Sequence, residues 1–181
     1  MFAFDSIEMR DSRLVGGSFA HWLAGFAAGE GCFYLRCRFE NGYWRRGAGF
    51  KISLRSDDLP ILKEIHRFLR CGRIGVSEKG DSRNPNSKPS ATFEVKTIRD
   101  LKLVIVPLFE SYPLRAKKSR DFEIWKEAVA LLYRVNQRRV HTKWTQPETE
   151  RMLGLCDDLT EVRKYKDIVW PLSRPGYFAG A

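Results

Sequence analysis

The amino-acid sequence lacks the cysteine and histidine spacings that build disulfide frameworks or zinc sites. Its four cysteines include no CxxC pair, and its three histidines are scattered along the 181 residues. Isolated cysteines of this kind usually act as small, buried apolar residues, and they indicate a protein of a reducing compartment. We therefore expect an intracellular protein, from a bacterial cytoplasm or from an organelle such as a mitochondrion or chloroplast.

The sequence also lacks a long apolar run and an apolar signal core near the N-terminus. These absences argue against secretion and against a membrane partner. Residues 1–17, which contain acidic side chains and end in two glycines, are interpreted as a leader.

Acidic residues are in the minority, with 22 Asp and Glu against 32 Lys and Arg, so the formal net charge is +10. The hydrophobic fraction of 43% is enough for a folded core. A compact domain this basic usually binds a polyanion, and nucleic acid is favoured here over an anionic membrane. A merely soluble basic surface explains the charge equally well, so charge alone does not decide between the two.

Two segments that alternate between apolar and polar residues predict an antiparallel hairpin. Apolar side chains stand at odd positions in residues 32–40, including Phe39, and at even positions in residues 45–55. Asn41-Gly42 is a strong hairpin signal, although we expect the loop to continue into the following residues. Residues 73–79, with Val76 facing inward, and residues 91–97 predict two further strands.

Helical spacing of apolar residues separates these pairs of strands. It predicts helices from Ser18 to about residue 30, from Ser56 to before Gly72, over about 98–109 with Pro107 near its end, over 119–134, and from about Thr145. The order predicts an α+β, αββαββα domain with a four-stranded antiparallel sheet and helices on one face. We assign this domain to residues 18–134, and residues 135–181 to a C-terminal helical extension and tail.

The open face of the predicted sheet carries the first functional signal. Cations recur on one face of successive strands, which favours nucleic-acid binding over an ordinary solvated sheet face. Arginine and lysine neutralise phosphates, while polar side chains contact base edges. The candidate binding residues are Tyr34, Arg36, Arg38, Arg45, Lys51, Ser53, Arg55, Arg73, Ser77, Lys79, Thr92, Glu94 and Lys96.

The first predicted helix carries side chains too small to fill a core. In LAGFAAGEG, residues 23–31, Ala24 and Ala28 are four residues apart, as are Gly25 and Gly29. Such a stripe permits a close helix–helix crossing. Because the chain contains no second copy of this pattern, the partner helix is expected from an identical subunit related by a two-fold axis. Tight packing within one subunit explains the spacing equally well.

Glu30 follows the small residues directly and precedes the basic strand. Hydrolysis of a phosphodiester uses a divalent metal ion, and a carboxylate can hold that ion. Two copies related by a two-fold axis would bring two such carboxylates together. A single glutamate at a helix end is also an ordinary surface residue, so this signal is weak by itself.

Together these features resemble the LAGLIDADG homing endonucleases, in the variant where glutamate replaces the functional aspartate. Leu23, Ala24, Gly25 and Gly31 match the motif directly, and Glu30 takes the place of the acid. The resemblance covers about residues 18–132. It implies the saddle-shaped αββαββα domain of that family.

The resemblance also implies a divalent-metal-dependent DNA endonuclease that cuts a long, pseudo-palindromic site and is encoded within an intron. The segment YPLRAK, residues 112–117, is similar to the family's YPL-x-x-K pattern and puts Lys117 at the active-site lysine. By the same resemblance, Glu30 and the carbonyl of Gly29 would hold Mg²⁺ or another divalent cation. Lys117 would stabilise transition-state charge or position water.

One motif per chain implies a homodimer through Ala24, Gly25, Ala28 and Gly29. The family often has a solvent-ordering polar residue at the end of the second strand, where this chain has Leu54, which cannot serve. Two other functions fit the same fold. One is an RNA-binding intron maturase, and the other is a DNA-binding protein that does not cleave.

Overall fold

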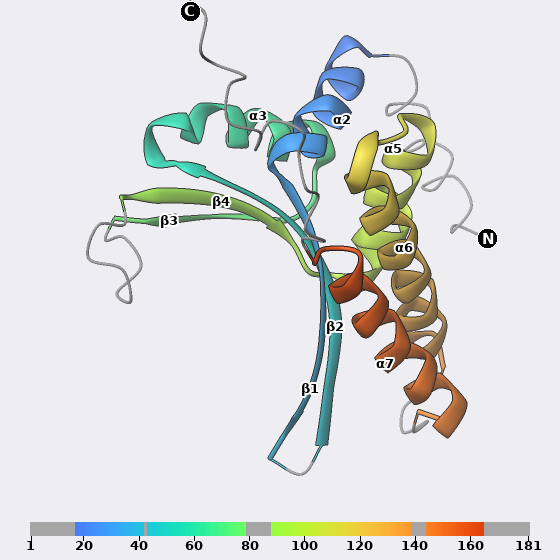
Figure 1. Ribbon diagram of the computed structural model, residues 1–181. Coiled ribbons are helices and arrows are strands. Elements are labelled where there is room, and N and C mark those ends of the chain that lie inside the picture. Colours follow the sequence, from blue (N-terminus) through green and yellow to red (C-terminus); the bar gives the residue numbers. More distant parts are fainter. Residues whose placement is uncertain (1–16, 42, 79–87, 139–143, 165–181) are drawn as a thin grey trace, which may run out of the picture.

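The computed structural model describes residues 17–41, 43–78, 88–138 and 144–164. Four strands form one antiparallel sheet: β1 (Gly31–Glu40), β2 (Tyr43–Arg55), β3 (Arg73–Ser77) and β4 (Ser90–Val95). Their order across the sheet is β1-β2-β4-β3. The sheet bends strongly, so that one of its faces is concave (Figure 1).

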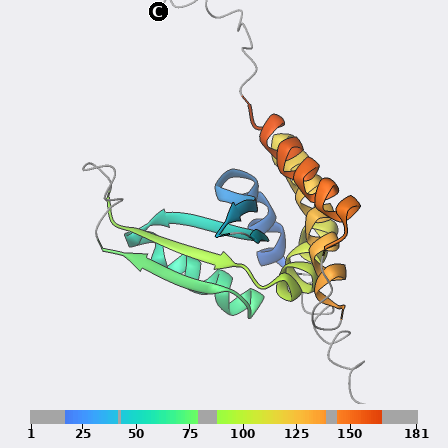
Figure 2. The ribbon, with the colours of Figure 1, turned by 90° about the horizontal axis from the view of Figure 1, so that it is seen from below.

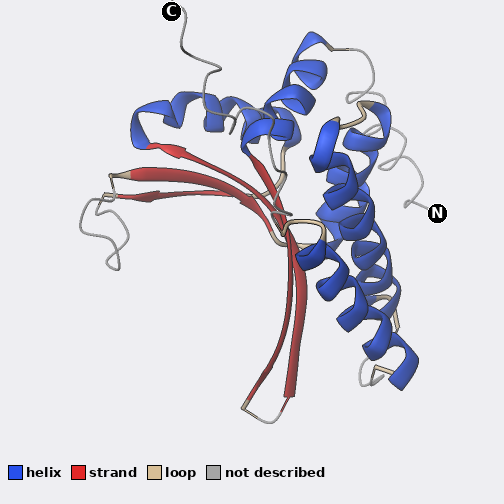
Figure 3. Ribbon diagram, viewed as in Figure 1, coloured by secondary structure: helices blue, strands red, loops and turns tan. Residues whose placement is uncertain are grey.

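The helices of the described chain all lie on the convex side of the sheet, and the concave side carries none of them (Figure 3). The predicted α+β class, with four antiparallel strands and helices on one face, is confirmed. None of the described helices combines the length and apolar character needed to cross a bilayer. The helical segments are α2 (Ser18–Glu30), η1 (Ser56–Asp58), α3 (Leu59–Leu69), α4 (Ile98–Asp100), η2 (Leu101–Ile105), α5 (Val106–Ser111), α6 (Ala116–Asn136) and α7 (Gln146–Glu161).

The core lies between the helices and the convex face, where the inward residues of each strand meet. Phe33 and Phe50 stand opposite each other on β1 and β2, with ring centroids 5.1 Å apart. The Phe33 ring also contacts Phe109 at 5.5 Å and Trp125 at 5.0 Å, and all four side chains are buried. Each such ring stabilises the fold by about 2 kcal/mol through burial alone. This cluster anchors β1, which carries the polar face on its other side.

The β1–β2 hairpin is tighter than the sequence predicts. Glu40 pairs with Tyr43, so the loop is limited to two residues and does not extend further. Asn41 adopts a left-handed backbone conformation with φ of 52°, which asparagine tolerates better than most residues. The turn signal was therefore sufficient by itself, and the expected longer loop was wrong.

Two apolar residues predicted to face inward are largely exposed. Phe39 is 62% exposed near the tip of the hairpin, and Val76 is 52% exposed on the edge strand β3. Alternation determines which face of a strand a residue occupies, but it does not determine whether another element covers that position.

The helix predicted over about 98–109 runs without interruption from Ile98 to Ser111, and the π-helical segment η2 lies in its middle. Pro107 is the second residue of α5, which follows this segment. Proline lacks an N–H group, and its ring excludes the carbonyl four residues earlier, so the wider π turn lets the helix continue past it. Pro107 therefore alters the helix without ending it.

Helix α7 packs against α6 and β1 (Figures 1 and 2). Its N-terminus is a capping box, because the Thr145 hydroxyl accepts from the Glu148 N–H while the Glu148 carboxylate accepts from the Thr145 N–H. Arg138 also donates to both carboxylate oxygens of Glu148. Met152 and Leu155 join the same core as the sheet. The domain division at residue 134 stays a prediction, and most of the predicted leader and the tail from 165 lie outside the described residues.

Candidate functional site

The concave face of the sheet gathers the residues predicted to bind nucleic acid. In the strand register, Arg38 pairs with Arg45, Lys51 with Glu94, and Ser53 with Thr92, so these residues share one face. Arg73 pairs with Glu94 from the other side. Every predicted binding residue of the described chain lies on or directly beside this face, and Lys79 lies outside the described residues.

Like charges stand directly opposite each other at the outer part of this face. Arg38 and Arg45 are paired across β1 and β2, an arrangement that destabilises a sheet in isolation. Glu40 offsets part of this repulsion through an ion pair of 3.1 Å with Arg45. Clustered cations of this kind are suited to a phosphate backbone, which neutralises them.

One basic residue of the hairpin belongs to the convex side. Arg46 pairs with Cys37 in the register, and its guanidinium lies 4.4 Å from the centre of the Trp144 ring and 5.6 Å from that of Trp44. It also donates to the Thr149 hydroxyl at 3.0 Å. Arg46 therefore links the hairpin to the start of α7.

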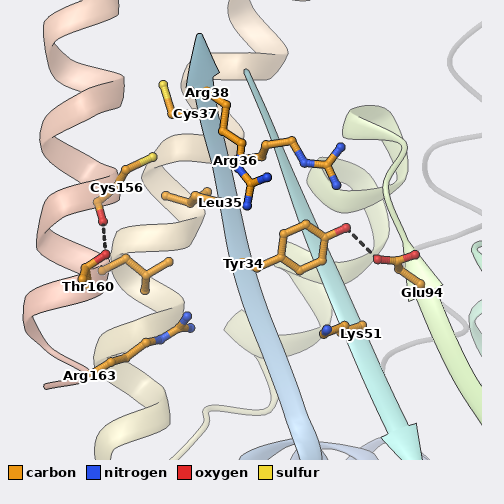
Figure 4. A pocket seen from close by; sticks show the side chains of 11 residues that line it. Tyr34, Leu35, Arg36, Cys37, Arg38, Lys51, Glu94, Cys156, Thr160 and Arg163 are labelled. Carbon is orange, nitrogen blue, oxygen red and sulfur yellow. Dashed lines mark hydrogen bonds between the residues drawn. The ribbon is translucent and has the colours of Figure 1, made fainter. Parts of the chain in front are cut away.

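Side chains from several strands form a hydrogen-bonded group on the concave face, and Figure 4 shows the bond between Tyr34 and Glu94 in it. The Tyr34 hydroxyl donates to Glu94 Oε1 at 2.7 Å, and Lys96 Nζ lies 2.6 Å from Glu94 Oε2. Lys51 Nζ lies 5.9 Å from the centre of the Tyr34 ring. Beside it, the hydroxyls of Ser53 and Thr92 are hydrogen-bonded at 2.9 Å.

The protonation of this group follows from these contacts. Burial raises the pKa of Tyr34, and its hydrogen bond to the Glu94 carboxylate raises it further, so the phenol stays protonated. Burial would also raise the pKa of Glu94. Hydrogen bonds from Lys96 and Tyr34, together with the nearby positive charges, outweigh that effect and hold the pKa below its ordinary value.

The end of α2 places Glu30 at the junction of the helix and β1. The Gly31 N–H closes the helix by donating to the Ala27 carbonyl. A Cβ atom on Gly31 would lie 2.5 Å from that carbonyl oxygen and 3.1 Å from the Phe50 ring, so close approach requires glycine here. Glu30 is exposed, and its carboxylate has no ion-pair partner among the described residues.

A second lysine, which the sequence pattern did not identify, also lies at the junction of α2 and β1. Lys118, in the first turn of α6, donates from Nζ to the Gly31 carbonyl at 2.6 Å. Lys117 is the predicted active-site residue, and it is exposed on the same turn. Its role stays a prediction. The YPL pattern locates this part of the chain, but it does not show which of the two adjacent lysines faces β1. That depends on how α6 is rotated about its axis.

The small-residue stripe of α2 is partly open. Gly25 and Gly29 are exposed, and a Cβ atom added to either would meet nothing within 4 Å. Ala28 is half-buried, whereas Ala24 is only 7% exposed. A hollow of about 450 Å³ adjoins the stripe, lined partly by Tyr112. Within the described chain, packing against another element therefore accounts for Ala24 but leaves both glycines uncovered.

A single carboxylate at this junction limits what one chain can hold. No group of three or more His, Cys, Asp or Glu residues within the described ranges could hold a metal ion. Mg²⁺, however, is commonly held by one or two carboxylates, with substrate phosphates and water as its other ligands. Glu30 fits that pattern. The Gly29 carbonyl belongs to the last turn of α2, and the helix ends before one of its own N–H groups could donate to that carbonyl.

No disulfide joins the four cysteines, all of which lie in the described ranges, and two of them, Cys37 and Cys156, have thiols that stay protonated. Cys71 is buried, and the others are half-buried. Burial raises the pKa of Cys37, and it raises the pKa of Cys156 to about 12, with a further contribution from the adjacent Cys37. Thiols that stay protonated are poor nucleophiles.

Comparison with known proteins identifies the family. Residues 23–129 match the sequence profile of the LAGLIDADG endonucleases. The chain is 30% identical over 119 residues to "Probable intron-encoded endonuclease 2" of Neurospora crassa, covering 66% of this chain and 23% of that protein. It is also 30% identical over 120 residues to "Probable intron-encoded endonuclease Cox1-I1b" of Schizosaccharomyces pombe, covering 66% and 29% respectively.

Solved structures share the fold. I-SmaMI, bound to uncleaved DNA target in the presence of calcium ions, matches with a TM-score of 0.66 at 23% identity, over 78% of this chain and 45% of that chain. The LAGLIDADG meganuclease I-CpaMI, bound to uncleaved DNA, matches with a TM-score of 0.62 at 24% identity, over 75% and 42%. The chain thus spans less than half the length of each of these four relatives. The profile match covers more than half of this chain, and the protein belongs to the LAGLIDADG endonuclease family.

Proposed function

We propose that the protein is an intron-encoded homing endonuclease that makes a metal-dependent double-strand cut in a long, pseudo-palindromic DNA site. The observation that carries this proposal is the exposed Glu30 carboxylate at the end of α2, beside a concave cationic sheet. Family membership supports the class of reaction. The relatives' names describe them as intron-encoded, which supports an origin of this protein within an intron as well.

The concave face would bind the duplex. A β-ribbon fits the major groove of B-form DNA, which is about 12 Å wide. Arginines such as Arg36 and Arg38 would neutralise phosphates, and the polar group around Tyr34 would contact bases. The deep, narrow major groove of A-form RNA suits such a ribbon poorly, which favours cleavage of DNA over an intron-maturase role.

Glu30 and the Gly29 carbonyl would hold a divalent cation, with Mg²⁺ the expected ion. When bound, the metal would activate water and offset the negative charge on the leaving oxygen. The Lys118 ammonium lies at the backbone one residue beyond Glu30 and is therefore well placed to stabilise charge on the scissile phosphate. Lys117, in the same turn, is the competing candidate for this role.

Cleavage of both strands would require a second copy of the chain. Each subunit supplies one Glu30, and a two-fold axis would bring two carboxylates to the two scissile phosphates. Ala24, Gly25, Ala28 and Gly29 would form the helix–helix contact. The open space at both glycines supports this assignment.

The substitution Glu30→Gln tests this function. The amide keeps the size of the side chain but removes the charge that holds the metal, so cleavage should be lost while binding persists. Plasmid carrying the intron-insertion sequence would be incubated with Mg²⁺, and binding would be measured by gel shift on the same duplex. Cleavage by Glu30→Gln at the wild-type rate would exclude this mechanism. Preferential binding of intron RNA over the duplex would favour the maturase instead.

A further inference from the structure

Glu94 is an acid at the centre of a cationic face. Lys51 on β2 and Arg73 on β3 stand directly opposite it in the register, and Lys96 forms an ion pair with it. Its side chain is 26% exposed, so part of the carboxylate faces the concave side. A carboxylate repels phosphate and would weaken nonspecific binding. Its position therefore needs an explanation other than affinity for the DNA backbone.

The carboxylate is held in place by a side chain that crosses a whole strand. Tyr34 belongs to β1 and Glu94 to β4, and β2 lies between them. The Tyr34 ring lies over Gly49 of β2, where a Cβ atom would be 2.2 Å from the ring carbon Cζ and 2.3 Å from the hydroxyl oxygen. Only glycine leaves room for the ring at this position. Gly47, two residues earlier on the same face, has nothing within 4 Å of a Cβ atom.

The resulting contacts leave Glu94 able to accept further hydrogen bonds. Its Oε1 atom accepts from the Tyr34 hydroxyl, and its Oε2 atom is paired with Lys96. Each carboxylate oxygen can accept two hydrogen bonds, so one position on each oxygen remains. Because the Tyr34 hydroxyl holds one carboxylate oxygen and Lys96 holds the other, the remaining acceptor positions have a defined direction before any ligand binds.

We propose that Glu94 is a specificity-determining residue, which accepts a hydrogen bond from the exocyclic amino group of a cytosine in the major groove, and that Tyr34 is its positioning residue. Cytosine presents its N4 amino group as a donor without a neighbouring acceptor of its own. Guanine and thymine present acceptors that a carboxylate repels, and adenine places the N7 acceptor beside its amino group. This inference rests on the proposed function, because it assumes that the concave face binds duplex DNA.

A purely structural role for Glu94 makes a different prediction. If the carboxylate only holds Lys96 and Tyr34 in place, its removal should change affinity for all DNA sequences to a similar degree. A readout role changes the preference at one base position in each half-site. The sequence dependence of binding, and not its strength, therefore separates the two roles.

The test uses the full chain and a pool of random-sequence DNA duplexes, equilibrated in EDTA so that bound DNA is not cut. Wild-type protein should enrich a site with cytosine at one position of each half. Glu94→Gln should reduce that preference at least about five-fold and leave the other positions unchanged. An unchanged preference at every position, with or without a uniform change in affinity, would overturn the inference. Failure of the wild-type protein to enrich any sequence would overturn the proposed function itself, and this inference with it.

Two matched glycine variants test the positioning role. Gly49→Ala should displace the Tyr34 ring and weaken the same base preference that Glu94→Gln weakens, whereas Gly47→Ala should leave it unchanged. If thermal denaturation shows that Gly49→Ala does not fold, Tyr34→Phe keeps the ring and removes only the hydroxyl. Tyr34→Phe should weaken the preference for cytosine at the same base position. Full retention of that preference in Tyr34→Phe would refute the role of Tyr34.

Discussion

On the concave face, side chains from different strands hold one another in place, whereas the Glu30 carboxylate at the end of α2 has no ion-pair partner in the described part of the chain. Tyr34 and Lys96 each hold one carboxylate oxygen of Glu94 within a single subunit. The end of α2 offers one acid and the backbone-bound Lys118. Under the proposed function, one chain would contain the means to bind DNA, whereas cleavage of both strands would depend on a second copy.

Salt should produce the largest effect, and it should act on binding alone. If about six of the cations on the concave face contact phosphates, affinity should fall about 1,000-fold between 50 and 200 mM salt. Filter binding over this range measures the slope. Arg36→Gln should reduce the slope by about one, while Arg134→Gln on α6 should leave it unchanged. A total change below about ten-fold would contradict a phosphate-binding role for this face.

Lysine substitutions should act on cleavage alone. Lys118→Met should slow single-turnover cleavage by about 100-fold or more, because it removes the positive charge held at the Gly31 carbonyl, one residue beyond Glu30, and binding should change little. Lys117→Met is the matched control in the same helical turn. A larger loss of cleavage in Lys117→Met than in Lys118→Met would assign the active-site role to Lys117, as the sequence pattern predicts.

A large side chain on the open stripe of α2 should weaken dimer formation without preventing the monomer from folding. Gly25→Leu adds a side chain where the described chain leaves space, so the monomer should fold. Close helix packing in a dimer should be weakened about ten- to a hundred-fold, which sedimentation would detect. Gly154→Leu, at a glycine of α7 with similar open space, is the control. An unaltered dimer in Gly25→Leu would exclude this stripe from the interface.

A substitution at the start of α7 should have the smallest effect, because it should change only the stability of the fold. Thr145→Ala removes the N-cap and should cost about 1 kcal/mol of unfolding free energy, measured by urea denaturation, with little change in cleavage.

Acid should weaken the same cap. The hydrogen bonds from Arg138 and from the Thr145 backbone lower the pKa of Glu148 from 4.5 to about 2. The stabilisation is therefore complete above about pH 4.5 and is lost as the pH falls towards 2. In Glu148→Gln this part of the acid dependence should be absent, and its persistence would show that other groups cause it.

The sequence was sufficient to predict the face of each strand but not its surroundings. Alternation placed Arg36, Lys51 and Glu94 on one face, because the period of a strand is two residues. The same alternation was wrong about burial at Phe39 and Val76, because cover depends on elements distant in the chain. The family motif likewise located Glu30 at a helix end.

Relationships that cross several elements could not be predicted from the sequence. The two lysines at 117 and 118 are adjacent, and only the packing of α6 brings Lys118 to Gly31. Similarly, Gly49 looks like an ordinary weak point in a strand until the Tyr34 ring is seen to cross it. A glycine within an alternating strand is a signal that another side chain approaches closely, although it does not identify that side chain.

The requirement for two copies is tested most directly by mixing wild-type and Glu30→Gln subunits at constant total concentration, with time for exchange before DNA and Mg²⁺ are added. If each double-strand cut needs both carboxylates, the linear product should fall with the square of the wild-type fraction, to about a quarter in an equal mixture. Linear product that falls only in proportion to that fraction, to about a half, would show that one chain cuts both strands alone.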